Sequence, residues 1–361
     1  MVTEQKKSYL VDFWTQVLSL DSESQLLNVL KNIPAEKLFS SLRSRRGRGR
    51  NDYPISEAWE TLYRRLLLAP NKQKNRFSES AFSRFLSQIK VNQELIIDMT
   101  HQQIKTFYLK TPLPKAPLIL GYFDDDKRGL RYSFLVESCF GIPIAVNLEK
   151  KSSDLFSVAY SLIEEFRQLF PFSGEQILIA NENYDDVSFI TKLWDEYHFK
   201  PIIPFKTTPE ISYTAPFPEK NILVSSLGEV FCISSSNEKK QMVYCGFEKK
   251  RGTLKFKCIS RCYQVDCKNQ SRCAAFLGVR IPLELDRKIF TPIPRSSYKI
   301  KLLYQRISSV QLFCSYLGSF KEKIRTCDLE KKRVFYLLLR SILYAIALEI
   351  PQKEKKPSAK K

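Results

Sequence analysis

The sequence predicts an α/β protein: a mixed sheet with flanking helices that follows an all-helical N-terminal domain and is interrupted by a β-rich insertion. Three observations support this class. Apolar residues recur at helical spacing over residues 1–112, apolar runs alternate with helical patterns over 113–206, and short β-type runs fill 207–297. With 43% hydrophobic residues, the 361-residue chain can bury a core, which excludes a fibrous or wholly disordered protein.

The N-terminal domain is expected to contain four helices, over residues 9–30, 55–68, 78–89 and 93–109. Between the first and the second lies a cluster of five arginines separated by serine and glycine: Arg43, Arg45, Arg46, Arg48 and Arg50. Such a cluster is either a solvated loop or a phosphate contact, and both interpretations stay open here. Phosphate contact would make residues 1–112 a DNA-binding domain.

The next segment, residues 113–206, predicts the first part of the sheet. Three short apolar runs separated by turns indicate an antiparallel meander; a capped helix, a buried strand, a second helix and a last strand follow. This element order is that of a ribonuclease-H-like fold. The expected elements are strands at 118–123, 131–138 and 143–148, a helix at 155–169, a strand at 176–180, a helix at 187–197 and a strand at 201–205.

A β-rich insertion is predicted over residues 207–297, and it carries a cysteine cluster. The gaps between the cysteines are close to those of structural zinc sites without matching them, so zinc ligation and ordinary reduced thiols both remain open. From Glu238 to Cys273 the insertion is strongly basic, with ten Lys/Arg against three acids. The cluster consists of Cys258, Cys262, Cys267 and Cys273.

Two helices, at 298–324 and 329–350, are expected to complete the core over residues 298–350, ahead of a basic tail at 351–361. The most apolar stretch, 334–350, is interrupted by Arg340 and Glu349 and is shorter than a bilayer requires, which favours a core helix over a membrane span. The start of the chain lacks a secretory pattern, so we expect a cytoplasmic protein with reduced thiols.

Charge indicates the class of partner. The chain has 58 Lys+Arg against 38 Asp+Glu, a net charge of +20, and nucleic acid is the first candidate for an anionic partner. A membrane surface is disfavoured because the basic residues are spread over several elements rather than one amphipathic face. The absence of a phosphate-binding Gly-Lys-Ser/Thr loop and of an HExxH helix removes support for ATP-driven and zinc-protease functions.

Five blocks in order along the chain resemble bacterial insertion-sequence DDE transposases. The longest is YDDVSFITKLWDEYHFKPII at 184–203, which is similar to the block after the second catalytic aspartate of that family. The resemblance extends over residues 40–345. The other blocks are GRNDYP at 49–54, FSRF at 82–85, GFEK at 246–249 and IFTPIPRSSYK at 289–299.

The resemblance implies a ribonuclease-H-like catalytic domain in which three carboxylates hold two Mg²⁺ or Mn²⁺ ions about 3.5–4 Å apart for cleavage and transfer of DNA strands. It further implies double-stranded DNA of transposon ends as the partner, a homodimer, and a bacterial, nucleoid-associated location.

This sequence departs from the family pattern where the acids are expected. Asn181 stands in place of the second aspartate and Gln311 in place of the glutamate. In the same helix Tyr304 keeps the family's tyrosine, and the arginine position is Ile307. We expect the neighbouring Arg306 to replace that arginine in part, as a contact to DNA.

The first acid is assigned to Asp124, at the end of the first apolar run; Asp125 and Asp126 are alternatives, and a charged hairpin turn is the non-functional interpretation. We expect Asp124, Asn181 and Gln311 to converge at one end of the sheet. Two functions follow: a DDE transposase with impaired Mg²⁺-dependent cleavage, or a non-catalytic DNA-binding relic of one.

Replacing the five arginines between residues 43 and 50 by alanine tests their role. If they and the basic insertion neutralise about six phosphates, affinity for duplex DNA falls roughly 10³-fold between 50 and 200 mM salt, and the replacement flattens that slope. Binding isotherms at a series of salt concentrations measure it. A slope equal to that of the unchanged protein would remove the arginines from the DNA interface.

Overall fold

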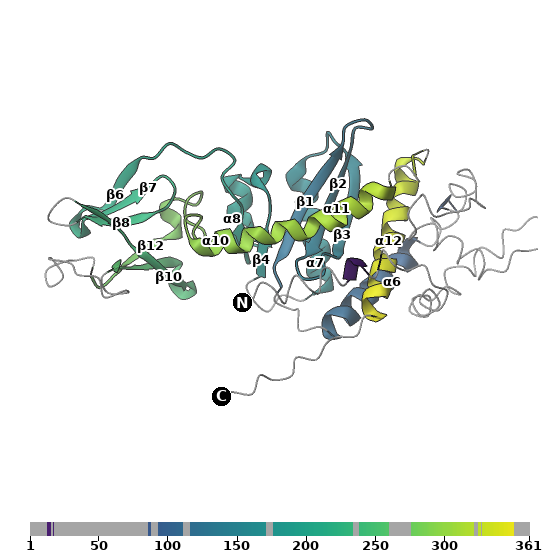
Figure 1. The fold of residues 1–361 in the computed structure, drawn as a ribbon, viewed down its shortest axis with the longest axis horizontal. Coiled ribbons are helices and arrows are strands. Elements are labelled where there is room, and N and C mark those ends of the chain that lie inside the picture. The colour runs from purple at the N-terminus through teal and green to yellow at the C-terminus, as the bar shows by residue number, and fades with distance from the viewer. Residues whose placement is uncertain are drawn as a thin grey trace, which may run out of the picture. The chain divides into compact units, whose positions relative to one another are not determined.

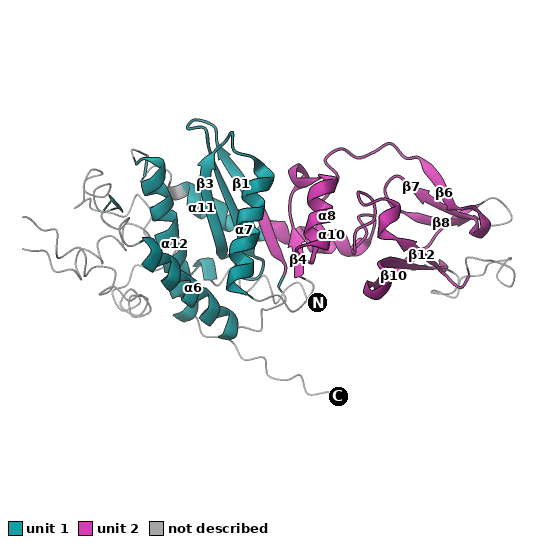
Figure 2. Ribbon diagram, turned by 180° about the vertical axis from the view of Figure 1, so that it is seen from behind, with its two compact units in different colours: residues 1–116, 121–172, 308–361 teal, residues 117–120, 173–307 magenta. Residues whose placement is uncertain are grey.

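The computed structural model describes residues 13–15, 17, 86–87, 93–110, 116–170, 176–233, 238–259, 276–320, 324–325 and 327–349. Several open sheets and helices make up these residues, which confirms the mixed α/β class (Figure 1). The chain forms two compact units (Figure 2): unit 1 has residues 1–116, 121–172 and 308–361, and unit 2 has residues 117–120 and 173–307. The first three N-terminal helices predicted from the sequence lie almost entirely outside the described residues.

The main sheet has five strands in the order β3-β2-β1-β4-β5. β2 and β3 pair antiparallel, whereas β4 runs parallel to both β1 and β5. The predicted strands are confirmed, and β5 begins two residues earlier than expected. The bounds are β1 Leu118–Asp125, β2 Leu130–Glu137, β3 Pro143–Lys150, β4 Gln176–Ile179 and β5 Phe199–Ile202.

In unit 1, helices cover both faces of the sheet. The predicted helix α7 (Leu155–Leu169) packs on β2 and β3, and Asp154 caps it by accepting a 2.8 Å bond from the Ser157 amide. Helix α11 (Ser309–Phe320) covers the other face, where the ring of Phe313 meets that of Phe134 at 5.4 Å. Accordingly, α11 crosses in front of the strands in Figure 1 and α7 lies in front of them in Figure 2.

The predicted core helix is confirmed as α12 (Leu329–Glu349), which is buried around most of its circumference and packs against α6 (Gln93–Lys110) and β3. Two of its arginines donate to carbonyl oxygens of β3, the outermost strand: Arg333 to Leu148 at 2.8 Å and Arg340 to Ile144 at 2.8 Å. The helix thereby covers a sheet edge that would otherwise expose unpaired backbone groups. Within the described residues, no helix combines the length and apolar character of a membrane span.

In unit 2, the predicted helix at 187–197 forms as α8 (Val187–Asp195) and packs on β5. The β-type runs of the insertion form two further antiparallel sheets, whose inward side chains share one apolar core that includes Leu254, Phe256 and Phe290. The strands are β6 Tyr213–Phe217, β7 Ile222–Ser225, β8 Val230–Ile233, β9 Lys239–Gln241, β10 Val243–Glu248, β11 Thr253–Lys257 and β12 Val279–Pro282.

The helix predicted over 298–324 is not continuous. It divides into α10 (Tyr298–Tyr304), a 3₁₀ turn η8 (Gln305–Ser308) and α11. The break coincides with Ile307 and two serines, residue types with lower helix propensity, because β-branching restricts side-chain rotamers and hydroxyls compete for backbone hydrogen bonds.

A buried carboxylate closes the turn between β2 and β3. Glu137 is fully buried and accepts hydrogen bonds from the amides of Cys139 (2.7 Å), Phe140 (2.6 Å) and Ile142 (3.2 Å). Burial raises the pKa of Glu137 to about 7, even though these bonds favour the ionised form.

The raised pKa of Glu137 makes stability fall as pH rises. Below pH 4.5 the carboxyl is protonated in both states; above it the unfolded chain ionises first, so the free energy of unfolding decreases through pH 7, by up to about 3 kcal/mol. Urea titrations between pH 5 and 8 should show a flatter dependence for Glu137→Gln than for the unchanged protein. The exposed Glu196→Gln is the matched control and should keep the original dependence. Equal slopes for all three proteins would contradict the assignment.

Candidate functional site

Asp124, the predicted first acid, is held by two cations. It lies in β1, and its carboxylate contacts Arg131 Nε of β2 at 2.9 Å and Lys151 Nζ at 3.6 Å. Lys151 also contacts Asp126, in the turn that follows β1, at 2.6 Å. The pKa of Asp126 is lowered by its hydrogen bond from Lys151. Both carboxylates therefore belong to a charge-compensated hairpin.

Asp125 ends β1 and lies in a separate ion pair. Its Oδ2 contacts Arg128 Nη1 at 3.0 Å within the turn, and the residue is buried. All three acids of the cluster are thus paired with basic side chains. Asp124 and Asp125 are strand residues, so the alternative of a simple charged turn describes only Asp126.

Asp124 belongs to a polar network on one face of the sheet. The guanidinium of Arg131 lies 4.7 Å from the ring centroid of Tyr122. Glu149 of β3 stands directly opposite Arg131 of β2 in the strand register. Glu149 is buried and accepts a 2.8 Å bond from the Ser133 hydroxyl. Burial raises the pKa of Glu149, although the bond from Ser133 and nearby arginines oppose that shift. The alternation of residues along the strands could predict that these polar side chains share a face of the sheet, but not which of them contact one another.

Asp124 and the helix that carries Gln311 lie on opposite faces of the sheet. The ring of Phe123 stacks on Tyr132 at 4.5 Å, on the same face as Phe134 and therefore as α11. Because successive side chains of a strand alternate, Asp124 points to the other face and Asp125 to that of α11. Within unit 1 the structure thus separates Asp124 from α11, on which Gln311 is exposed.

Asn181 follows β4 in unit 2. Its side-chain oxygen accepts a 3.2 Å bond from the Asn183 amide and caps the 3₁₀ turn η3 (Glu182–Tyr184). The amide oxygen thus has a local structural role. The expected convergence of Asp124 with Gln311 is wrong, because the two lie on opposite faces of the sheet in unit 1. Asn181 belongs to unit 2, so its approach to either residue stays a prediction.

A buried ion pair joins two of the blocks that carry the family resemblance. Arg295 Nη2 of the IFTPIPRSSYK block contacts Asp185 Oδ1 of the YDDVSF block at 2.6 Å, and both side chains are 2% exposed. The second oxygen of Asp185 accepts a 2.9 Å bond from the Lys206 amide, and the guanidinium lies 4.3 Å from the centroid of Phe205. This pair could not be predicted from the sequence, because no spacing rule relates residues 110 positions apart.

Tyr304 and Arg306 lie at the end of α10 and in η8, both in unit 2. Tyr304 is half-buried, and its pKa is raised by burial and then by the nearby Glu182. The arginine cluster at 43–50 lies outside the described residues. So do Cys262, Cys267 and Cys273, whereas Cys258 is a buried free thiol.

The residues at the predicted acid positions do not fit a pair of Mg²⁺ ions as they stand. A metal at Asp124 would have to displace Arg131 or Lys151, and Asn181 and Gln311 bring oxygen without charge. In the described part of the chain, no three His, Cys, Asp or Glu side chains gather as a metal site would require.

Comparison of the chain with protein-family models, with curated proteins and with solved structures finds no match. The resemblance of the five sequence blocks to transposases therefore stays a prediction.

Proposed function

We propose that this protein binds double-stranded DNA as a relative of the insertion-sequence DDE transposases, with strand cleavage impaired. The strand order β3-β2-β1-β4-β5, with β2 and β3 antiparallel and β4 and β5 parallel to β1, supports a ribonuclease-H-like core. The ion pair between Asp185 and Arg295 supports a common framework for two of the resembling blocks.

The observation that carries the impaired activity is the compensation of Asp124 by two cations. Two-metal cleavage of a phosphodiester needs several negatively charged oxygen ligands, since each offsets part of the charge of the ions. Here Arg131 and Lys151 neutralise the one assigned carboxylate, and amides occupy the other two positions.

The charge of the chain supports the binding half of the proposal. The net charge of +20 attracts polyanions, and the insertion exposes Lys249, Lys250 and Arg251 together in the turn between β10 and β11. Phosphate contacts of this kind supply affinity without reading sequence, so the strength of binding should depend on salt more than on the DNA site.

Restoring acids tests the cleavage half. Asn181→Asp with Gln311→Glu should raise Mn²⁺ affinity and increase nicking of a supercoiled plasmid above the background of the unchanged protein, because both ions then gain charged ligands. Asn181→Asp alone should change nicking little.

The control removes each candidate first acid from the double variant, as Asp124→Ala or as Asp125→Ala. Loss of nicking in one of these variants identifies the first acid. We expect it to be Asp125, because its side chain points to the sheet face that α11, the helix of Gln311, covers. Robust Mn²⁺-dependent nicking by the unchanged protein, abolished by Asp124→Ala or by Asp125→Ala, would contradict the proposal, since an active transposase would then remain.

A further inference from the structure

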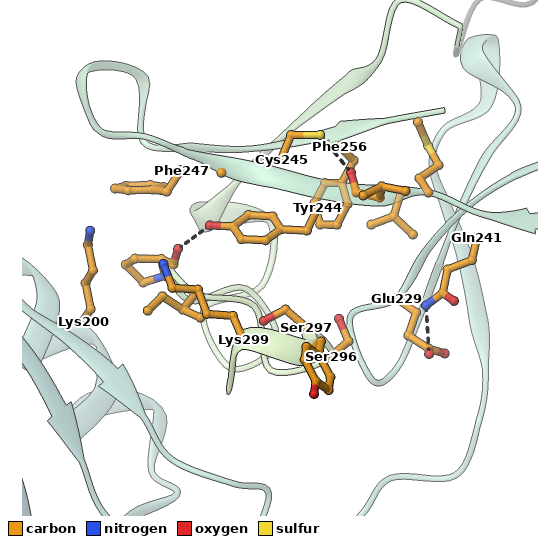
Figure 3. A pocket seen from close by; sticks show the side chains of 17 residues that line it. Lys200, Glu229, Gln241, Tyr244, Cys245, Phe247, Phe256, Ser296, Ser297 and Lys299 are labelled. Carbon is orange, nitrogen blue, oxygen red and sulfur yellow. Dashed lines mark hydrogen bonds between the residues drawn. The ribbon is translucent and has the colours of Figure 1, made fainter. Parts of the chain in front are cut away.

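Unit 2 contains a cavity of about 530 Å³ beside β10 and the segment 292–299 (Figure 3). In the figure, the amino groups of Lys200 and Lys299 lie on one side of the cavity, and Glu229 lies on the other, where Gln241 Nε2 contacts Glu229 Oε1 at 3.2 Å. Tyr244 lies between the two sides. The cavity is therefore polarised, with cations facing a carboxylate across an aromatic wall.

Consecutive residues in and beside β10, 242–247, form the aromatic wall of the cavity. In β10, Tyr244 pairs with Phe256 and Gly246 with Lys255, so Cys245 is the extra residue of a β-bulge, and Gly246 has φ of +137°. A bulge turns neighbouring side chains out of their regular alternation, which brings residues 242–247 to the cavity together.

The aromatic wall is fixed and stays neutral. The Tyr244 hydroxyl donates a 2.9 Å bond to the carbonyl of Pro292, which ties β10 to the opposite segment of the cavity. Burial raises the pKa of Tyr244 to about 12, so the ring carries no charge near neutral pH. Phe247 is held by an edge-on contact with Trp194, at 5.2 Å between ring centroids.

We propose that this cavity binds a single nucleotide unit whose base carries an amino group. Lys200 and Lys299 bind the phosphate through charge-assisted hydrogen bonds, and the rings of Tyr244 and Phe247 contact the plane of the base. Glu229 accepts a hydrogen bond from the exocyclic amine of the base. The volume is that of a small-ligand site. Thymine lacks such an amine, so the carboxylate of Glu229 discriminates against it.

Two sources share this chemistry: a free mononucleotide and the terminal nucleotide of a DNA strand. The inference does not rest on the proposed duplex binding, because it uses only residues that line the cavity. Titration calorimetry of the full chain at low salt, with dAMP, dTMP and a 5′-phosphorylated single-stranded dA tetramer, separates the sources. Duplex binding measured on the same preparation reports on the proposed function separately.

The unchanged protein should bind dAMP, the tetramer or both, and adenine ligands several-fold more tightly than dTMP. Lys200→Gln with Lys299→Gln should weaken binding of each ligand about tenfold, because charge-assisted contacts to the phosphate are lost. Glu229→Ala, which removes the acceptor oxygens, should bring the ratio of dAMP to dTMP affinity close to one. The exposed Lys288→Gln, which removes a single positive charge outside the cavity, should leave every affinity unchanged.

Two outcomes would overturn the inference. One is the absence of saturable binding for all three ligands by the unchanged, folded protein. The other is binding that responds equally to the lysine pair and to Lys288→Gln, since general surface charge would then account for it. A circular dichroism spectrum like that of the unchanged protein is required of each variant.

Discussion

The constraint on which this structure depends is that a charge removed from water needs a partner. An uncompensated buried ion costs several kcal/mol, which is comparable with the whole stability of a domain. The protein meets this constraint with specific pairs: Asp185 with Arg295 in unit 2, and Arg340 with Glu165 and the carbonyl of Ile144 in unit 1. Glu137 is an exception, because backbone amides rather than a cation surround it.

The same constraint decides what the acids of the hairpin can do. In a catalytic metal site, the metal ion neutralises the negative charge of carboxylates that would otherwise repel one another. Here basic side chains neutralise that charge. Arg131 and Lys151 hold Asp124, and Arg128 holds Asp125. The acids at the end of β1 thus have a structural role in the hairpin, and under the proposed relation to transposases the uncharged Asn181 and Gln311 belong to the same impaired site.

Much of the fold could be predicted from local patterns. The strands of the main sheet, the capped helix α7 and the core helix α12 follow from periodicity, caps and turn residues, which act within a few residues. The break at η8 was missed because Tyr298 to Phe320 carries apolar residues at helical spacing throughout, and only weak propensities at Ile307 and the serines oppose it.

The candidate site was less predictable, for a physical reason. Period-two alternation correctly places Tyr122 and Asp124 on one strand face, but it cannot tell which face a distant helix will cover. That choice depends on contacts such as Phe134 with Phe313, which are 179 residues apart. The pairs Asp124–Lys151 and Asp185–Arg295, and the polarised cavity at Lys200, Glu229 and Lys299, likewise join segments that are distant in sequence.

Basic side chains, rather than metal ions, compensate the acids at the end of β1. Electron paramagnetic resonance of Mn²⁺ added to the unchanged protein tests this compensation most directly, because bound and free Mn²⁺ give different spectra. We expect the spectrum of free Mn²⁺ in the unchanged protein, and a bound fraction to appear once Arg131→Met and Lys151→Met release Asp124. Stoichiometric Mn²⁺ binding by the unchanged protein that disappears in Asp124→Ala would contradict the account.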